Sequence, residues 1–269
     1  MRATFREHAP HVVFHAAAYK HVPLLERHPH HAVRTNVLGT YRLCRLAQEY
    51  AVSCFVFISS DKAADPVNVL GASKRIGELI VQAMARDAAS ETRFCAVRFG
   101  NVIGSRGSVV PTFMKQIERG GPITVTDPET TRFFMTIPEA CGLVVLTSTL
   151  AESGSLFLLD MGEPVRIVDL ATKMTRLRGL RVDRDIAIRY TGLRPGERLH
   201  EMLTSPNETL VASRYEKILH LVDEHQTPSL DSLRQQLAAL EERLELTDGA
   251  RVREELFALA DARVPVKQR

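Results

Sequence analysis

The sequence contains no tryptophan and only four cysteines, which are scattered along its 269 residues. No two of them form a C-x-x-C pair, so the sequence predicts neither a zinc site nor a disulfide framework. All four lie in apolar runs, which indicates buried thiols in a reducing compartment. Seven histidines fall in the first 31 residues, but no carboxylate or thiol pattern accompanies them, and no metal site is expected.

Long apolar runs and a strong net charge are absent as well. No run reaches the length of a membrane span, and the N-terminal residues have no signal-peptide pattern. The net charge of +3 is too small to indicate binding to nucleic acid or to an anionic membrane. A small net charge is still compatible with a local basic pocket that binds a phosphate. The sequence therefore predicts a cytoplasmic protein with no nucleic-acid partner and no membrane span in this chain.

A glycine-rich phosphate-binding turn is also missing. A chain that opens on a doubly wound sheet usually carries G-x-G-x-x-G after its first strand, where a pyrophosphate approaches the backbone. The most similar segment here, "GSRGS" at 104–108, follows the third predicted strand and opens no immediate helix.

Strands and helices alternate through the first hundred residues. Short buried strands are predicted at 11–18, 53–59 and 93–102, and helices at 29–50 and 70–89. This alternation indicates an α/β fold with a Rossmann-like parallel sheet, in which ligands bind at the carboxyl ends of the strands. The loops after Ala18, Ser59 and Phe99 should therefore lie at one rim.

The pattern changes in the second part of the chain. Shorter strands, loops and helices alternate up to about residue 222, and one of these helices begins at Thr136 and Pro138. From about Leu230, two amphipathic helices interrupted at Asp248-Gly249 close the chain, and their pattern favours a packed helical pair.

Proton-transfer groups gather in "SSDKAADPVNVLGASKRIGE", residues 59–78, directly after the second strand. Ser59, Ser60, Asp61 and Lys62 stand together at the strand end, where the chain turns and neighbouring side chains can reach one pocket. Lys74 follows in the first turns of the next helix. The same residues also fit a solvated loop with two unlike charges and a surface lysine, and the local pattern leaves both interpretations open.

The longer motifs of the chain resemble a known family. The resemblance runs from about Pro10 to Val222 and is carried by five ordered segments: "VVFHAAAYKHVPLLERHPHHAVRTNVLGTYRL", "FISSDKAADPVNVLGASKRIGE", "VRFGNVIGSRGSVVPTFMKQIERGGPITVTDPETTRFFMTIPEA", "FLLDMGEPVRIVDLA" and "TGLRPGERLHE". Together these segments are similar to the CapD-like polysaccharide-biosynthesis UDP-sugar 4,6-dehydratases, an extended branch of the short-chain dehydrogenase/reductases.

This resemblance implies a lyase that uses NAD to remove water from a UDP-N-acetylhexosamine. The expected product is a UDP-4-keto-6-deoxy sugar for surface polysaccharide or glycan biosynthesis. By similarity, Asp61 is the acid that protonates the departing C6 hydroxyl and Lys62 is the base that takes the C5 proton. Ser60 contacts the C4 oxygen, and Lys74 binds the nicotinamide ribose.

Other positions acquire roles from the same resemblance. Arginine suits a diphosphate because its planar fork makes paired charge-assisted hydrogen bonds, although any single arginine also fits a surface ion pair. The expected cofactor-binding residues are Ala16, Ala17, Ala18, Lys20, Asn36, Ser59 and Lys74. The expected substrate-binding residues are Asn101, Arg106, Arg132, Arg194 and Glu197.

The chain departs from the family in two respects. Leu70 stands where the wider superfamily has a tyrosine, four residues before the lysine, so the C4 proton must leave by another route, such as Ser60 and water. The N-terminal glycine-rich part of the family is expected to be missing, as in a truncated chain. We therefore expect this chain alone to bind NAD weakly or not at all and not to turn over. Full-length relatives are often anchored to the inner membrane.

The resemblance also predicts a division into functional domains. Residues 1–110, completed by 138–160, should be the C-terminal half of the NAD-binding Rossmann-like domain. Residues 111–222 should be largely a smaller mixed α/β lobe for the UDP-sugar, and 223–269 a helical tail. Similar enzymes pair their subunits through helices near 29–50 and 70–88, so a homodimer is expected.

Two other functions compete with the dehydratase. One is a nucleotide-sugar epimerase or reductase of the same superfamily, which Asp61 and Lys62 disfavour because such an enzyme eliminates nothing at C6. The other is a non-catalytic sugar-nucleotide-binding remnant, which the missing glycine loop and Leu70 favour.

Overall fold

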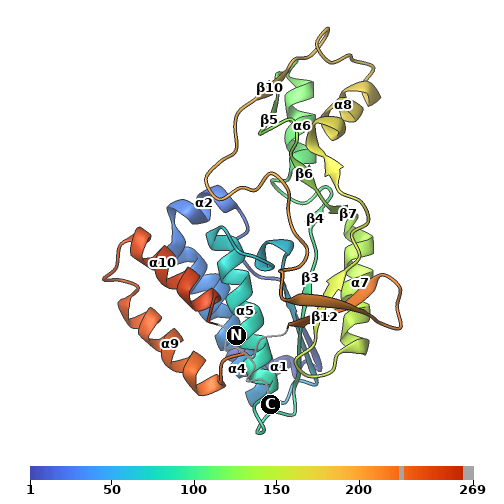
Figure 1. Ribbon diagram of the computed structural model, residues 1–269. Helices are drawn as coiled ribbons and strands as arrows, with labels where there is room; N and C mark the ends of the chain where they lie inside the picture. Colours follow the sequence, from blue (N-terminus) through green and yellow to red (C-terminus); the bar gives the residue numbers. More distant parts are fainter. Residues whose placement is uncertain (224–226, 263–269) are drawn as a thin grey trace. The chain divides into compact units, whose positions relative to one another are not determined.

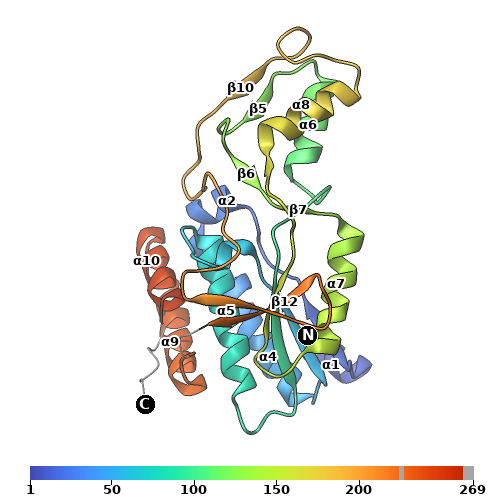
Figure 2. The same ribbon diagram turned by 45° about the vertical axis from the view of Figure 1, so that its right-hand side comes forward.

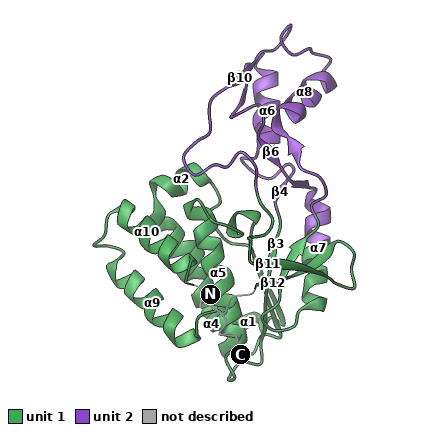
Figure 3. Cartoon of the chain, viewed as in Figure 1, with its two compact units in different colours: residues 1–99, 143–160, 202–269 green, residues 100–142, 161–201 purple. Residues whose placement is uncertain are grey.

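The structure is a computed structural model that describes residues 1–223 and 227–262. Its contacts divide the chain into two compact units, coloured separately in Figure 3. These two units are defined by packing contacts. The domains expected from the sequence are defined by function, so the functional division stays a prediction. The first unit holds residues 1–99, 143–160 and the described residues from 202 on, and the second holds 100–142 and 161–201.

A six-stranded sheet forms the centre of the first unit (Figure 1). Four neighbouring strands are parallel, which confirms the predicted Rossmann-like sheet, and two antiparallel strands extend it on one side. That antiparallel extension was not predicted. In spatial order the strands are β1 (Val12–His15), β2 (Cys54–Ile58), β3 (Arg93–Arg98), β8 (Leu156–Leu159), β12 (Ile218–Asp223) and β11 (Glu208–Ala212).

Helices cover both faces of this sheet (Figures 1 and 2), which is why its central strands are continuous apolar runs. In the part of the chain that the structure describes, no helix is long and apolar enough to cross a membrane. One face carries α4 (Gly39–Glu49) and α5 (Val69–Ala85), and the other carries α7 (Ile137–Leu150). Shorter helices are α1 (Arg2–His8), α2 (Val22–Arg27) and α3 (Pro29–His31).

The predicted helix at 29–50 is helical throughout but is not one regular helix. Between α3 and α4 lies η1 (Ala32–Leu38), a π-helical segment with a wider turn. Such segments are uncommon and often occur at functional sites. Apolar periodicity cannot reveal this change, because the buried positions of a single wide segment still follow roughly helical spacing.

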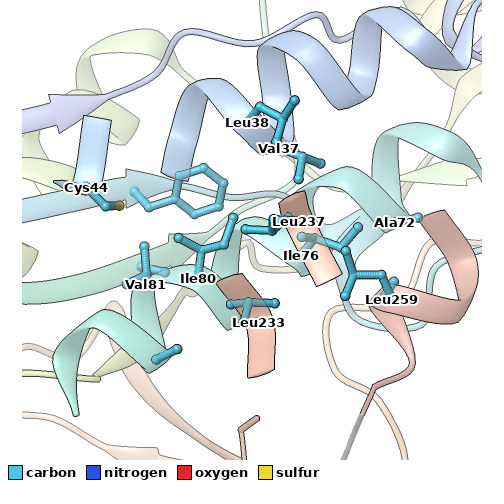
Figure 4. Close-up of a cluster of buried hydrophobic side chains, with 14 of the residues drawn as sticks. Val37, Leu38, Cys44, Ala72, Ile76, Ile80, Val81, Leu233, Leu237 and Leu259 are labelled. Carbon is cyan, nitrogen blue, oxygen red and sulfur yellow. The ribbon is translucent and has the colours of Figure 1, made fainter. Parts of the chain in front are cut away.

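The C-terminal helices form as predicted, and both pack on the first unit. They are α9 (Leu230–Arg243) and α10 (Gly249–Ala260), and Asp248 caps α10 by accepting a hydrogen bond from the Arg251 amide. Figure 4 shows Leu233, Leu237 and Leu259 of this pair beside side chains of η1 and α5. The pair thus covers part of the helices expected to join two subunits, and the dimer stays a prediction for their remaining surface.

The second unit has a small core of its own, formed by α6 (Val109–Glu118), α8 (Ile167–Leu177) and the strands between them. Its strands pair in three short two-stranded sheets, as expected for a smaller mixed α/β lobe. These pairs are β10 (Ile188–Tyr190) with β5 (Ile123–Val125), β4 (Asn101–Val102) with β7 (Phe134–Met135), and β6 (Thr131–Arg132) with β9 (Val165–Arg166).

Candidate active site

The loops that follow β2 and β3 meet at the carboxyl end of the sheet in the first unit. The Ser59 amide donates to the Val97 carbonyl at 2.8 Å, and the Asp61 amide donates to the Phe99 carbonyl at 3.1 Å. These backbone bonds hold the start of the 59–78 segment against the end of β3, at the rim where ligands bind in parallel sheets.

Asp61 and Lys62 form an ordered acid–base pair in the short turn η2 (Asp61–Ala63). The Asp61 side chain is buried, and its Oδ1 atom accepts from the Ser60 hydroxyl at 2.8 Å, the Lys62 amide at 2.9 Å and the Lys62 ammonium at 3.1 Å. Within the described residues, its buried Oδ2 atom has no hydrogen-bond partner. One oxygen therefore orients the carboxyl group, and the other remains for a proton or a ligand.

Lys74 reaches from α5 to the end of β2. It is 6% exposed, its ammonium donates to the Ile58 carbonyl at 2.7 Å, and it lies 4.8 Å from the centre of the Phe57 ring. Burial lowers the pKa of Lys74 from 10.5 to about 8, while the nearby Glu78 carboxylate raises it. The structure thus excludes the surface-lysine interpretation.

Asn36 connects the loop after β1 to α5. Its amide oxygen accepts from the Tyr19 amide at 2.9 Å, and its amide nitrogen donates to the Tyr19 carbonyl and the Ser73 hydroxyl, both at 3.0 Å. The π-helical turn of η1 carries this buried side chain, which fixes the loop in which Ala16, Ala17, Ala18 and Lys20 lie.

His15 is a core histidine, as expected from its apolar strand. It is 4% exposed, and its Nε2 atom lies 2.9 Å from the Thr40 hydroxyl. Burial, with a smaller effect of the Lys74 charge, lowers the pKa of His15 from 6.5 to about 4, so the ring is neutral at pH 7.

Arg98 is a buried arginine close to this rim that was not predicted from the sequence. Arg98, the last residue of β3, makes two hydrogen bonds to Glu78 of α5, at 2.6 and 2.7 Å, and two to Glu208 of β11, at 2.8 and 2.9 Å. None of the three side chains is measurably exposed. Burial alone would raise the pKa of the Glu78 carboxyl, but Arg98 and Arg75 hold it below its usual value.

Two further charged residues complete this network, and a serine joins it to the site. Arg75 pairs with Glu78 at 3.2 Å and with Asp223 at 2.6 Å. The Ser59 hydroxyl donates to Glu78 at 2.6 Å, so the residue before Ser60 is tied to the network. Arg75, Glu78 and Arg98 lie among apolar residues in the sequence. Because charged residues are rarely buried without a partner, this pattern could have indicated an ion network.

Gly71 allows α5 to lie directly against the Asp61–Lys62 turn. A Cβ atom at this position would overlap the Lys62 carbonyl oxygen. The preceding Asn68 caps the helix, since its side chain accepts from the Gly71 amide at 2.8 Å. Leu70, at the position where a tyrosine was expected from the superfamily, is buried in the apolar core.

The residues expected to bind substrate all lie in the second unit. Arg132 donates to the carbonyls of Thr131 at 2.7 Å, Arg198 at 2.9 Å and Leu199 at 3.0 Å, so its guanidinium holds the 194–201 loop. In that loop the Arg194 amide donates to Glu197 at 3.2 Å, and the Arg194 side chain is exposed.

Two more predicted residues have different surroundings within that unit. Asn101 lies in β4 and pairs with Phe134 of β7, which is two residues after Arg132 in the sequence. Arg106 is exposed in the loop after β4. The structure thus brings Arg132 together with the 194–201 loop, and the roles of all five residues stay predictions.

Comparison with known proteins identifies the class to which this fold and site belong. The chain belongs to the Polysaccharide biosynthesis protein family, which matches residues 1–223. It is 56% identical to the capsular polysaccharide biosynthesis protein CapD of Staphylococcus aureus over 79% of this chain. It is also 38% identical to a UDP-glucose 4-epimerase of Rickettsia rickettsii over 75% of this chain and 58% of that protein.

A solved structure supports the fold. The X-ray structure of Pen from Bacillus thuringiensis is 35% identical in sequence and superposes with a TM-score of 0.67, covering 85% of this chain and 75% of that one. The chain spans only about a third of the length of the Staphylococcus aureus relative, since the match covers 35% of it.

We expect Gly71→Ala to displace the Asp61–Lys62 turn, because the new methyl group would overlap the Lys62 carbonyl oxygen. The variant should lose about 1–3 kcal/mol in its free energy of unfolding, as typical for overpacked sites. Gly142→Ala is the matched control, since its Cβ would meet no atom within 4 Å. Urea unfolding measures both variants, and equal stabilities would contradict the close contact.

We expect one lysine to titrate near pH 8 in the folded chain and to disappear in Lys74→Met. Because the folded-state pKa lies below the ordinary value of 10.5, the folded state binds fewer protons than the unfolded state between pH 8 and 10.5. The free energy of unfolding of the wild type relative to Lys74→Met should therefore increase with pH across that window. NMR of the lysine side chains checks the titration, and a lysine set that titrates entirely above pH 9.5 would refute it.

Proposed function

We propose that this chain carries the catalytic residues for NAD-dependent dehydration of a UDP-N-acetylhexosamine. The product is the UDP-4-keto-6-deoxy sugar, used for surface polysaccharide or glycan biosynthesis. The observation that carries this proposal is the buried Asp61, whose one oxygen is held by Ser60 and Lys62 while the other has no partner among the described residues.

The acid–base roles follow the requirements of an elimination. Removal of water across C5 and C6 needs a base for the C5 proton and an acid for the C6 hydroxyl, close together. Lys62 is the proposed base and Asp61 the proposed acid, and their 3.1 Å contact permits a proton to pass between them. Ser60 adjoins both and is proposed to contact the C4 oxygen.

The residues of the first unit fit the nicotinamide end of NAD. Lys74 provides a buried cation at the end of β2, and the small residues Ala16, Ala17 and Ala18 leave the backbone after β1 accessible. When bound, NAD supplies a hydride acceptor and donor. The sequence contains no glycine-rich turn for the pyrophosphate, so we propose that the chain by itself binds NAD weakly and does not turn over.

The substrate is proposed to bind through the second unit. Arg194 and Arg106 offer exposed guanidinium groups suited to a diphosphate, and Arg132 shapes the loop that carries Arg194 and Glu197. In functional terms, we assign residues 1–110 with 138–160 to the cofactor, apart from Asn101 and Arg106, and residues 111–222 largely to the UDP-sugar. The described residues from 227 on carry the C-terminal helical pair.

Epimerisation is the second candidate reaction, since the chain is similar to a UDP-glucose 4-epimerase. Asp61 and Lys62 still favour dehydration, because an epimerase eliminates nothing at C6. A non-catalytic role is the third candidate, supported by Leu70 and by the missing glycine-rich turn.

We expect the chain to convert UDP-N-acetylglucosamine when it is extended at its N-terminus with a glycine-rich dinucleotide-binding segment and supplied with NAD. Mass spectrometry should show a sugar nucleotide lighter by one water. Asp61→Asn should slow this conversion by about 100-fold or more, the usual contribution of a general acid. Asp65→Asn makes the same chemical change at an exposed residue of the same segment and should leave the rate unchanged.

The outcomes separate the three candidates. A product of unchanged mass but different chromatographic mobility would establish epimerisation. Calorimetric binding of the UDP-sugar without any conversion would establish a binding module. Conversion by the chain without the extension would contradict the proposal on NAD affinity while leaving the reaction in place.

A further inference from the structure

The C-terminal helical pair lies beyond the residues that the family matches, which end at 223. It nevertheless packs against both helical segments that carry site residues: η1, with Asn36, and α5, with Lys74. Figure 4 shows Leu237 and Leu259 beside Ile76, and Val37 close by. The buried leucines of the pair are Leu233, Leu237, Leu240, Leu256 and Leu259.

Polar contacts fix the pair on the side of α3 and η1. The His30 Nε2 atom lies 2.9 Å from the Thr247 carbonyl oxygen, and Gly249 packs against the Pro29 ring. Arg34 of η1 forms an ion pair with Glu245. The turn between α9 and α10 is therefore attached to the segment that carries Asn36.

A second set of contacts joins α10 to the start of α5. The Arg253 guanidinium pairs with Glu26 Oε2 at 3.1 Å, and Glu26 Oε1 accepts from the Val69 amide at 2.6 Å. The Glu26 side chain is 13% exposed, and Arg253 stacks on the Phe257 ring of its own helix at 4.5 Å. Glu26 thus satisfies an N–H group of the first helical turn that has no partner within the helix.

The start of α5 also lies directly against the Asp61–Lys62 turn. Val69 is its first residue, and two residues later Gly71 lies against the Lys62 carbonyl oxygen. A continuous path of contacts therefore leads from Arg253 through Glu26 and Val69 to Lys62. The ion pair and the hydrogen bond to the Val69 amide are short, and Gly71 leaves no space for a Cβ atom against the Lys62 carbonyl oxygen.

We propose that Glu26 and Arg253 are positioning residues, through which α10 holds the first turn of α5 and, with it, the Asp61–Lys62 turn. The C-terminal helical pair is then part of the scaffold of the site. The catalytic consequence rests on the proposed function, whereas the structural effect on the turn does not.

Amide hydrogen exchange tests the proposal on the full chain. Arg253→Ala should accelerate exchange in segments 61–65 and 69–71 by about fivefold or more, the effect expected when a hydrogen bond to a charged group is weakened. Exchange in β2 and β3 should not change. Arg251→Ala removes the same charge from the same helix. Among the described residues Arg251 forms ion pairs only within α10, with Glu254 and Glu255, and its side chain is 64% exposed, so this variant should have no effect there.

Two substitutions at Glu26 separate the contacts. Glu26→Gln keeps an oxygen for the Val69 amide but removes the ion pair, so it should accelerate exchange in the same segments. The effect should be smaller than that of Arg253→Ala, which also removes the hydrogen bond from Arg253 to the Val67 carbonyl at 3.4 Å. Glu26→Ala removes both contacts and should accelerate exchange further. Equal exchange in Arg253→Ala and Arg251→Ala, or faster exchange spread evenly over the first unit in both Arg253→Ala and Glu26→Gln, would overturn the proposal.

The conversion assay adds a catalytic readout. In the extended chain, Arg253→Ala should lower kcat and leave KM for the UDP-sugar unchanged, since the second unit is untouched, and Arg251→Ala should change neither. An equal kcat for the two variants would count against positioning. If no variant forms product, the proposed function fails, and the exchange experiment still decides the present proposal.

Discussion

The structure of the first unit depends on one buried ion network. Arg98 and Arg75 share Glu78, Glu208 and Asp223, all of them less than a tenth exposed. Taking these charges out of water costs several kcal/mol each, and their ion pairs and hydrogen bonds offset that cost. The network joins β3, α5, β11 and β12, so it connects the parallel part of the sheet to its antiparallel extension.

The same network also affects two residues at the carboxyl end of the parallel strands, Ser59 and Lys74. The Glu78 carboxylate accepts a hydrogen bond from the Ser59 hydroxyl. Burial lowers the pKa of Lys74, and the charge of Glu78 raises it. Ser59 leads directly into the turn that orients Asp61. The network therefore fixes Ser59 next to the Asp61–Lys62 pair, and through Glu78 it partly offsets the effect of burial on the pKa of Lys74.

Much of this could be predicted from the sequence, because the information was local. The β–α alternation predicted the parallel sheet, and the Asp248-Gly249 break predicted the boundary between α9 and α10. The motif around Asp61, Lys62 and Lys74 indicated which residues gather at the rim. The network was not predictable in this way, since Glu208 lies 110 residues from Arg98 and nothing local pairs them. The π-helical turn and the Arg253–Glu26 contact likewise depend on tertiary packing.

The most direct test of the account is the free energy of unfolding of Arg98→Met. We expect a loss of about 3–5 kcal/mol, because the substitution leaves two buried carboxylates without their main cation. Arg2→Met, which removes an exposed ion pair with Glu49, should lose no more than about 1 kcal/mol. Equal stabilities of the two variants would contradict the claim that the buried network holds the first unit together.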